Sequence, residues 1–114
     1  MNPTIVLAAL VTSIFTLLGT AKILAVPPMR HLASEVGFSV DAYRRVGVLE
    51  VAGAIGVAVG LAVPLLGGLA ATGLLLLLAG ALITHVRLGD GLQKYAPVIV
   101  CGLLVVGYLV ALTH

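Results

Sequence analysis

Residues 68–86 read GLAATGLLLLLAGALITHV, an uninterrupted stretch without Lys, Arg, Asp or Glu. Its length is what an α-helix needs to cross a hydrocarbon core of roughly 30 Å, because each helical residue adds about 1.5 Å. Lipid cannot satisfy backbone amide and carbonyl groups, so a spanning segment must close its own hydrogen bonds as a helix does. The stretch therefore predicts a transmembrane helix.

Three further apolar stretches of similar length lie at 3–22, 45–63 and 96–113. Together with residues 68–86 they predict an all-α integral membrane protein, a four-helix bundle that forms a single transmembrane domain over 1–114. The connections between them are unequal. We expect a tight turn at Pro64–Gly67 and a short charged loop from Arg87 to Tyr95, whereas the first loop has room for extra structure.

The first loop carries signals for one short helix. Pro27-Pro28 ends the first span, and Met29–Val36 has the mixed character of an interfacial helix. Gly37 is suited to its C-cap, and Ser39 to the N-cap of the following span. We therefore expect a short interfacial helix between the first two spans.

Composition supports the membrane assignment and excludes other classes. Of 114 residues, 61% are apolar and 9% are charged, whereas soluble domains have about 45–50% and 25%. The basic residues are scattered without interleaved aromatic residues, so no nucleic-acid partner is expected. Cys101 is the one cysteine, which excludes a disulfide or a CxxC pair within one chain.

The basic residues predict the orientation. All six lie in or beside the first and third loops: Lys22, Arg30, Arg44, Arg45, Arg87 and Lys94. Positive charge favours the cytoplasmic side. We therefore expect both of these loops in the cytoplasm, with both termini and the second connection outside, in a cytoplasmic membrane.

Small residues mark faces where helices can approach closely in lipid. Gly56 and Gly60 form a small-xxx-small pair, and Gly73 with Gly80 predicts a matching seam on the next helix. These seams could also join copies of the chain in a homo-oligomer. Hydroxyl groups follow one face of the first helix: Ser13, Thr16 and Thr20.

Glu50 is the residue that most strongly indicates a site. It lies roughly 8 Å inside its span at about 1.5 Å per residue, where an acid usually faces the bundle interior and pairs with a cation. Lys22 ends the first span and His85 ends the third on the same side of the membrane. We therefore predict a cytoplasmic-side polar pocket of Glu50, Lys22 and His85, with these as candidate catalytic residues.

The residues expected around the pocket, as candidate substrate-binding groups, are Tyr43, Arg44, Arg45, Arg87, Asp90 and Tyr95. Each side chain also has a purely structural interpretation. Glu50 and Lys22 could form a salt bridge that only joins two helices, or Lys22 could extend to the headgroups. His85 suits a helix C-terminus, the arginines suit lipid phosphates, and the tyrosines, Tyr108 included, suit the membrane interface.

Three segments together resemble the DoxX-like family: Gly19–Lys22, Tyr43–Gly53 and Ala81–His85. They carry Gly-x-x-Lys, Gly-x-x-Glu and Thr-His in the family's order. The resemblance covers nearly the whole chain and implies a small four-helix bacterial membrane protein. The family's name derives from a small subunit of a quinone-linked sulfur oxidoreductase, and relatives are described with membrane oxidoreductase assemblies. A membrane oxidoreductase partner and a quinone are thus implied by resemblance alone.

Three classes of function remain open. The first is an enzyme or binding protein for a lipophilic small molecule of quinone, isoprenoid or epoxide type, with Glu50 as acid/base and His85 relaying the proton. The second is a non-catalytic accessory subunit of a membrane oxidoreductase complex. The third is a small transporter or proton conduit, although no ionisable residue occupies the outer half of any span.

No cofactor or metal site is evident in the sequence. His31, His85 and His114 lie in a loop, at a helix end and at the terminus, so no pair has metal-ligand spacing. No dinucleotide, phosphate-loop or nucleophile-elbow motif occurs. A redox step would need an electron carrier from elsewhere, such as a quinone.

Overall fold

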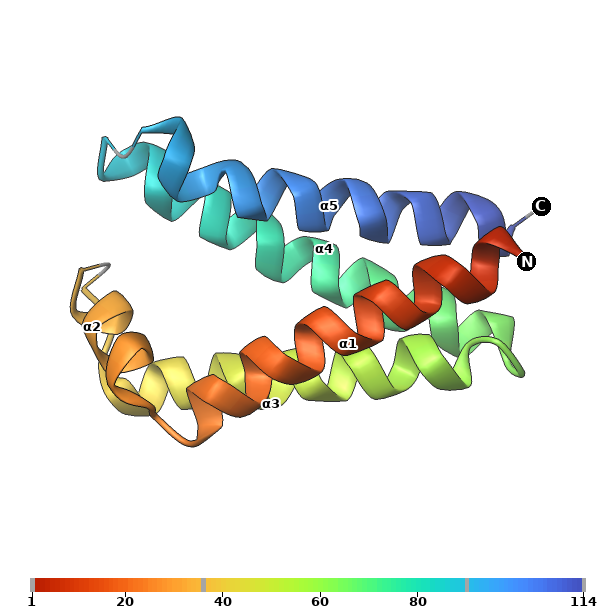
Figure 1. The fold of residues 1–114 in the computed structure, drawn as a ribbon, viewed down its shortest axis with the longest axis horizontal. Coiled ribbons are helices and arrows are strands. Elements are labelled where there is room, and N and C mark those ends of the chain that lie inside the picture. The colour runs from red at the N-terminus through yellow and green to blue at the C-terminus, as the bar shows by residue number, and fades with distance from the viewer. Residues whose placement is uncertain (1, 36, 90, 114) are drawn as a thin grey trace.

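The computed structural model describes residues 2–35, 37–89 and 91–113, and these residues form an all-helical fold (Figure 1). The helices are α1 Pro3–Ile23, α2 Pro27–Glu35, α3 Val40–Val59, α4 Pro64–Arg87 and α5 Leu92–Leu112. The all-α prediction is confirmed, and so is a short helix in the first loop. Pro27 and Pro28 open this helix, however, and do not end the first span, because α1 already stops at Ile23.

Side chains and a glycine cap the helix ends, and the predicted roles of Gly37 and Ser39 are confirmed. The Asn2 side chain accepts a hydrogen bond of 2.8 Å from the Thr4 amide at the start of α1. Gly37 follows α2 with a φ of +77°, a conformation that glycine adopts without strain. Ser39 then caps α3, where its hydroxyl oxygen accepts a 3.0 Å hydrogen bond from the Ala42 amide.

The turn predicted at Pro64–Gly67 is wrong. Helix α3 ends at Val59 and α4 already begins at Pro64, so the chain reverses over residues 60–63. Proline has a φ suited to the first helical position, where its missing N–H leaves no intrahelical bond unmade. Pro64 therefore opens a helix here and does not form part of the turn.

Three of the described helices are long and apolar enough to cross a membrane: α1, α4 and the Tyr95–Leu112 part of α5. Helix α3 is not among them, although we expected a fourth span at 45–63. It begins at Val40 and ends at Val59, so it includes Arg44, Arg45 and Glu50 and stops before the apolar residues that follow. Helix α3 is long enough to cross a membrane, but its charged residues distinguish it from the three apolar helices.

The four long helices lie side by side, and each packs against two others (Figure 1). Helix α1 contacts α3 and α5, and α4 contacts the same two helices from the other side. Both chain termini and the α3–α4 turn lie at one end of the molecule, which we name the terminal end. Helix α2 and the α4–α5 connection lie at the opposite end, named here the loop end.

Helices α3, α4 and α5 pack closely at the terminal end. The Tyr108 side chain is fully buried, and its hydroxyl donates a 2.9 Å hydrogen bond to the Val57 carbonyl. A methyl group at Gly60 or Gly67 would collide with that hydroxyl, so both glycines are needed for the approach of α3 and α4. Tyr108 thus belongs to the core, contrary to its predicted place in an interface belt.

The helices separate toward the loop end. In Figure 1, α3 and α4 meet at their turn and diverge along their length, so that the pair α1 and α3 lies apart from the pair α4 and α5 near α2. The buried core ends before this region. Its members are Ala8, Val11, Phe15, Ala54, Val57, Ala71, Leu74, Val105 and Tyr108.

Candidate functional site

A cavity of about 420 Å³ occupies the space between the diverging helices. Its volume falls within the roughly 300–1,000 Å³ of small-molecule sites. The residues that line it come from all four long helices and from the loop before α3: Phe15, Leu18, Lys22, Phe38, Tyr43, Val46, Glu50, Leu76, Leu77, Leu78, Gly80, Ala81, Thr84, His85, Pro97, Val98 and Cys101. The walls are mostly apolar, and the few polar groups converge at the loop end.

Glu50 and Lys22 form an ion pair on one wall of this cavity. Glu50 is 3% exposed and is the one buried charged residue among those that the structure describes. The Lys22 ammonium group donates a hydrogen bond to Glu50 Oε1. A buried carboxylate is costly unless it is paired and hydrogen-bonded, so Lys22 makes the position of Glu50 tenable.

Two glycines make this ion pair possible. Gly19 lies three residues before Lys22 on α1, and Gly47 lies three residues before Glu50 on α3. A Cβ atom at Gly19 would lie 2.7 Å from the Gly47 carbonyl oxygen, and one at Gly47 would lie 2.6 Å from the Gly19 carbonyl oxygen. The two backbones therefore touch directly. Residues three apart share a helix face, so the contact brings both charged side chains together.

Aromatic rings hold the lysine from the other side. The Lys22 ammonium nitrogen lies 5.1 Å from the centre of the Tyr43 ring, within the range of a cation–π contact. The Phe38 ring meets Tyr43 edge-on, with centroids 6.3 Å apart and planes at 81°. Lys22 is thus fixed between a carboxylate and a ring, and it lines the cavity.

His85 and Cys101 bring polar groups from the opposite helices. His85 is half-buried near the end of α4, and Cys101 is half-buried on α5; both line the cavity. The three residues predicted to converge, Lys22, Glu50 and His85, therefore surround one space. Whether any of them is catalytic stays a prediction.

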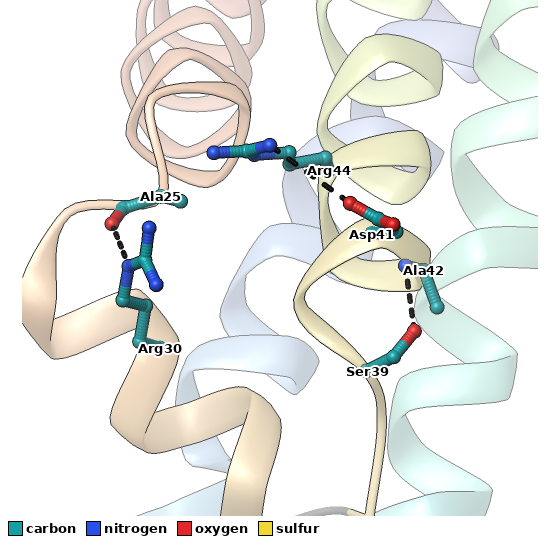
Figure 2. A network of polar contacts seen from close by, with 6 residues as sticks. All are labelled: Ala25, Arg30, Ser39, Asp41, Ala42 and Arg44. Carbon is teal, nitrogen blue, oxygen red and sulfur yellow. Dashed lines mark hydrogen bonds and ion pairs between the residues drawn. The ribbon is translucent and has the colours of Figure 1, made fainter.

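Of the other predicted site residues that the structure describes, Tyr43 lines the cavity and the rest do not. Arg44 is exposed and lies 3.8 Å from the Asp41 carboxylate on the same helix (Figure 2). Arg45 and Arg87 are exposed as well, and Tyr95 is half-buried, but none of these lines the cavity. Asp90 lies outside the described residues.

Arg30, another basic residue at the loop end, has a structural partner. Arg30 on α2 donates from Nε to the Ala25 carbonyl oxygen at 2.9 Å, which ties α2 to the turn after α1 (Figure 2). Ala25 has a φ of +52°, unusual for a residue with a side chain. The Arg30 contact stabilises this turn, which places α2 beside the ends of α1 and α3.

Several cavity residues were not predicted from the sequence. Phe38 sits in the first loop, where no periodicity marks it, and Val46 and Cys101 look like ordinary apolar positions in their helices. Pro97 did carry a signal. A proline inside α5 has no N–H to donate to the preceding turn, and such interruptions often line cavities in membrane proteins.

Chemically, the arrangement places a proton donor and a proton acceptor beside an apolar space. Lys22 can donate a hydrogen bond, and Glu50 and His85 can each accept or donate depending on protonation. No group of three His, Cys, Asp or Glu side chains that could hold a metal ion occurs in the described part of the chain. The site is therefore suited to binding a molecule that is largely apolar and carries a hydrogen-bonding group.

The fold and site define a small helical protein with a polar pair in an otherwise apolar cavity. The DoxX-like family matches residues 6–107, nearly the whole chain. The chain therefore belongs to the DoxX-like family, as the resemblance implied, and this membership together with the three apolar helices indicates a membrane protein. No curated protein and no solved structure matches it.

Proposed function

We propose that this DoxX-like protein is a membrane-embedded four-helix bundle that binds a lipophilic small molecule in the cavity. One observation carries the proposal: a buried, ion-paired carboxylate forms part of the wall of an apolar cavity of about 420 Å³. Ionisable residues inside spans usually mark a functional site. A structural salt bridge alone would not require an open space beside it.

Glu50 is the acid/base in this proposal. A ligand of quinone, isoprenoid or epoxide type carries a carbonyl, hydroxyl or ether oxygen that can meet the Lys22–Glu50 pair. Lys22 would hold that oxygen by a hydrogen bond, and Glu50 would give or take a proton. His85, on the facing wall, would exchange the proton with the loop end, because an imidazole can both accept and donate a proton.

The orientation follows from charge. The loop end carries the basic residues, and the positive-inside rule then puts this end in the cytoplasm of a bacterial cell, with both termini outside. A conduit across the membrane is disfavoured, because the core around Tyr108 fills the terminal end beyond the cavity. The proposed protein thus binds from the cytoplasmic half of the membrane.

A second candidate function, an accessory subunit, is favoured by one feature of α1. Ser13, Thr16 and Thr20 lie on its exposed face, where lipid offers no hydrogen-bond partner. Such hydroxyl groups commonly bond across helix interfaces in membranes. A stoichiometric protein that co-purifies with the chain and is lost on Thr16→Leu would support this function.

The binding proposal is tested by what the purified protein carries. The wild type, Glu50→Gln and the matched control Glu35→Gln would be purified from membranes and extracted with organic solvent, and the extracts compared by mass spectrometry. Glu35 is an exposed carboxylate on α2 that pairs with His31 at 3.0 Å, away from the cavity. We expect one lipophilic compound in the wild type and in Glu35→Gln that is depleted in Glu50→Gln. Equal amounts in all three proteins, or none, would overturn the proposal.

A further inference from the structure

We infer that the cavity opens sideways into the membrane between α3 and α4 beside Gly80, and that its ligand is an uncharged amphiphile whose chain leaves through this opening. The inference rests on the proposed function and adds to it the ligand's class, its path and the residue that controls the path. The loop end would hold the head group, and the bilayer would hold the rest of the chain.

The seam between α3 and α4 is closed at the terminal end and occupied by the cavity at the loop end. A Cβ atom at Gly53 would lie 2.6 Å from the Leu74 side chain, and one at Gly56 would lie 2.5 Å from Ala70. Positions 70 and 74 therefore mark the α4 face that meets α3. The helical repeat carries this face on to Leu77, Ala81 and Thr84, and all three line the cavity.

The same cavity reaches the outer surface of α4. Leu76 is 70% exposed and yet lines the cavity, and Gly80, one turn further on, is exposed and lines it too. Residues that face both the cavity and the surroundings form the edge of an opening. A Cβ atom at Gly80 would meet no atom within 4 Å, so the position is unobstructed.

The edge of the opening is apolar. The Thr84 hydroxyl is turned back along its own helix, where it donates a 2.9 Å hydrogen bond to the Gly80 carbonyl. Leu76 and Leu77 supply hydrocarbon on the other side. An apolar edge in a lipid-facing seam suits a hydrocarbon chain, because neither water nor a polar group would find a partner there.

The Lys22–Glu50 pair in the cavity wall determines which head group the ligand can carry. Lys22 and Glu50 already neutralise each other, so a charged head would lack a counter-ion and would lose its hydration on binding. An uncharged hydroxyl, carbonyl or ether oxygen can instead hydrogen-bond to the pair without that cost. The ligand is therefore a neutral amphiphile with a single long chain.

Gly73 provides a matched control for Gly80. It lies two turns earlier on nearly the same face of α4, and it is exposed. A Cβ atom there would also meet nothing within 4 Å, but Gly73 does not line the cavity. Gly80→Phe would thus place a ring in the opening, whereas Gly73→Phe would place the same ring on the surface. Neither change touches Lys22 or Glu50.

The probes are hexadecanol with a photoreactive diazirine beside its hydroxyl group and the hexanol analogue, which is short enough to lie inside the cavity. Hexanol can also enter at the loop end, where Phe38 lines the cavity and is 41% exposed. Each would be irradiated with the protein in lipid nanodiscs, and labelled peptides located by mass spectrometry. We expect both probes to label cavity residues in the wild type and in Gly73→Phe. In Gly80→Phe the hexadecanol label should fall at least about tenfold, because the ring must shift for a chain to pass, while the hexanol label persists.

The outcomes separate the two proposals. If hexadecanol labels Gly80→Phe as strongly as Gly73→Phe, the opening beside Gly80 is refuted while the binding proposal stands. Loss of both probes in Gly80→Phe would also refute it, because Gly80 would then shape the cavity itself and not a path to it. If neither probe labels the cavity in the wild type, the binding proposal fails and the opening fails with it.

Discussion

At the scale of single residues, Lys22 and Glu50 depend on each other. The carboxylate is buried and the ammonium group is its hydrogen-bond donor. Breaking a buried ion pair by removing one partner leaves an uncompensated charge, which is more damaging than removing both. The pair can thus be tested for coupling separately from any ligand.

We predict that Lys22→Met lowers the free energy of unfolding in detergent by about 3 kcal/mol, and that Lys22→Met combined with Glu50→Gln recovers most of that loss. Arg45→Met is the control, because Arg45 is exposed and outside the cavity. Thermal unfolding of the wild type, Lys22→Met, Glu50→Gln, the double variant and Arg45→Met would measure the coupling. A loss in Lys22→Met no larger than in Arg45→Met would contradict the pairing.

The sequence allowed the Lys22–Glu50 meeting to be predicted, because an acid inside a span requires a partner and Lys22 was the nearest cation on that side. The same reasoning predicted that His85 lies at the same membrane depth as Lys22 and Glu50. It did not predict Phe38 or Cys101 in the cavity, and it assigned Tyr108 to the interface when the residue is in the core. In a membrane protein both the interior and the lipid-facing surface are apolar, so the sequence pattern does not show which face of a helix an apolar residue occupies.

At the scale of helices, glycine contacts set how α1, α3 and α4 pack. The Gly19–Gly47 contact brings α1 against α3, and Gly60 with Gly67 brings α3 against α4. The predicted role of Gly60 in packing fits this contact. The seam predicted for Gly73 and Gly80 does not form within the chain, because added Cβ atoms there would meet nothing within 4 Å outside their own helix. Helix α4 is apolar on every side, so periodicity could not show which of its glycines faces inward.

We predict that Gly47→Ala destabilises the protein by about 1–3 kcal/mol, because its new methyl group would overlap the Gly19 carbonyl and force α1 from α3. Gly73→Ala is the matched control and should be neutral or stabilising by up to about 1 kcal/mol, the gain in helix propensity. Unfolding in detergent would compare the two. Equal effects would show that the close approach of α1 and α3 is not required.

At the scale of the whole molecule, the surface has the character of a membrane protein. Large apolar side chains face outward along the long helices, among them Leu17 at 72% and Leu65 at 75% exposure. The interior combines a few large residues, such as Tyr108, with small ones, such as Ala54 and Ala71. The long axis is 40 Å, enough to cross a hydrocarbon core of roughly 30 Å and reach both interfaces. Such a surface would associate in water, whereas lipid would cover it.

We predict that the loop end faces the cytoplasm. Single cysteines at Ser34 on α2 and at Thr113 after α5, each in a Cys101→Ser background, report the two ends of the molecule. A membrane-impermeant thiol reagent added to intact cells should label Thr113→Cys and leave Ser34→Cys unlabelled until the cells are opened. The reverse pattern would invert the orientation and place the cavity on the outer side.

The binding of a lipophilic molecule beside the ion pair is tested most directly by a density map of the protein in lipid nanodiscs, with Glu50→Gln for comparison. We predict elongated density in the cavity, with its polar end at Lys22 and Glu50, that is absent from Glu50→Gln. An empty cavity in the wild type, or one closed around an intact Lys22–Glu50 contact, would contradict the account and leave the pair as a salt bridge that only joins α1 to α3.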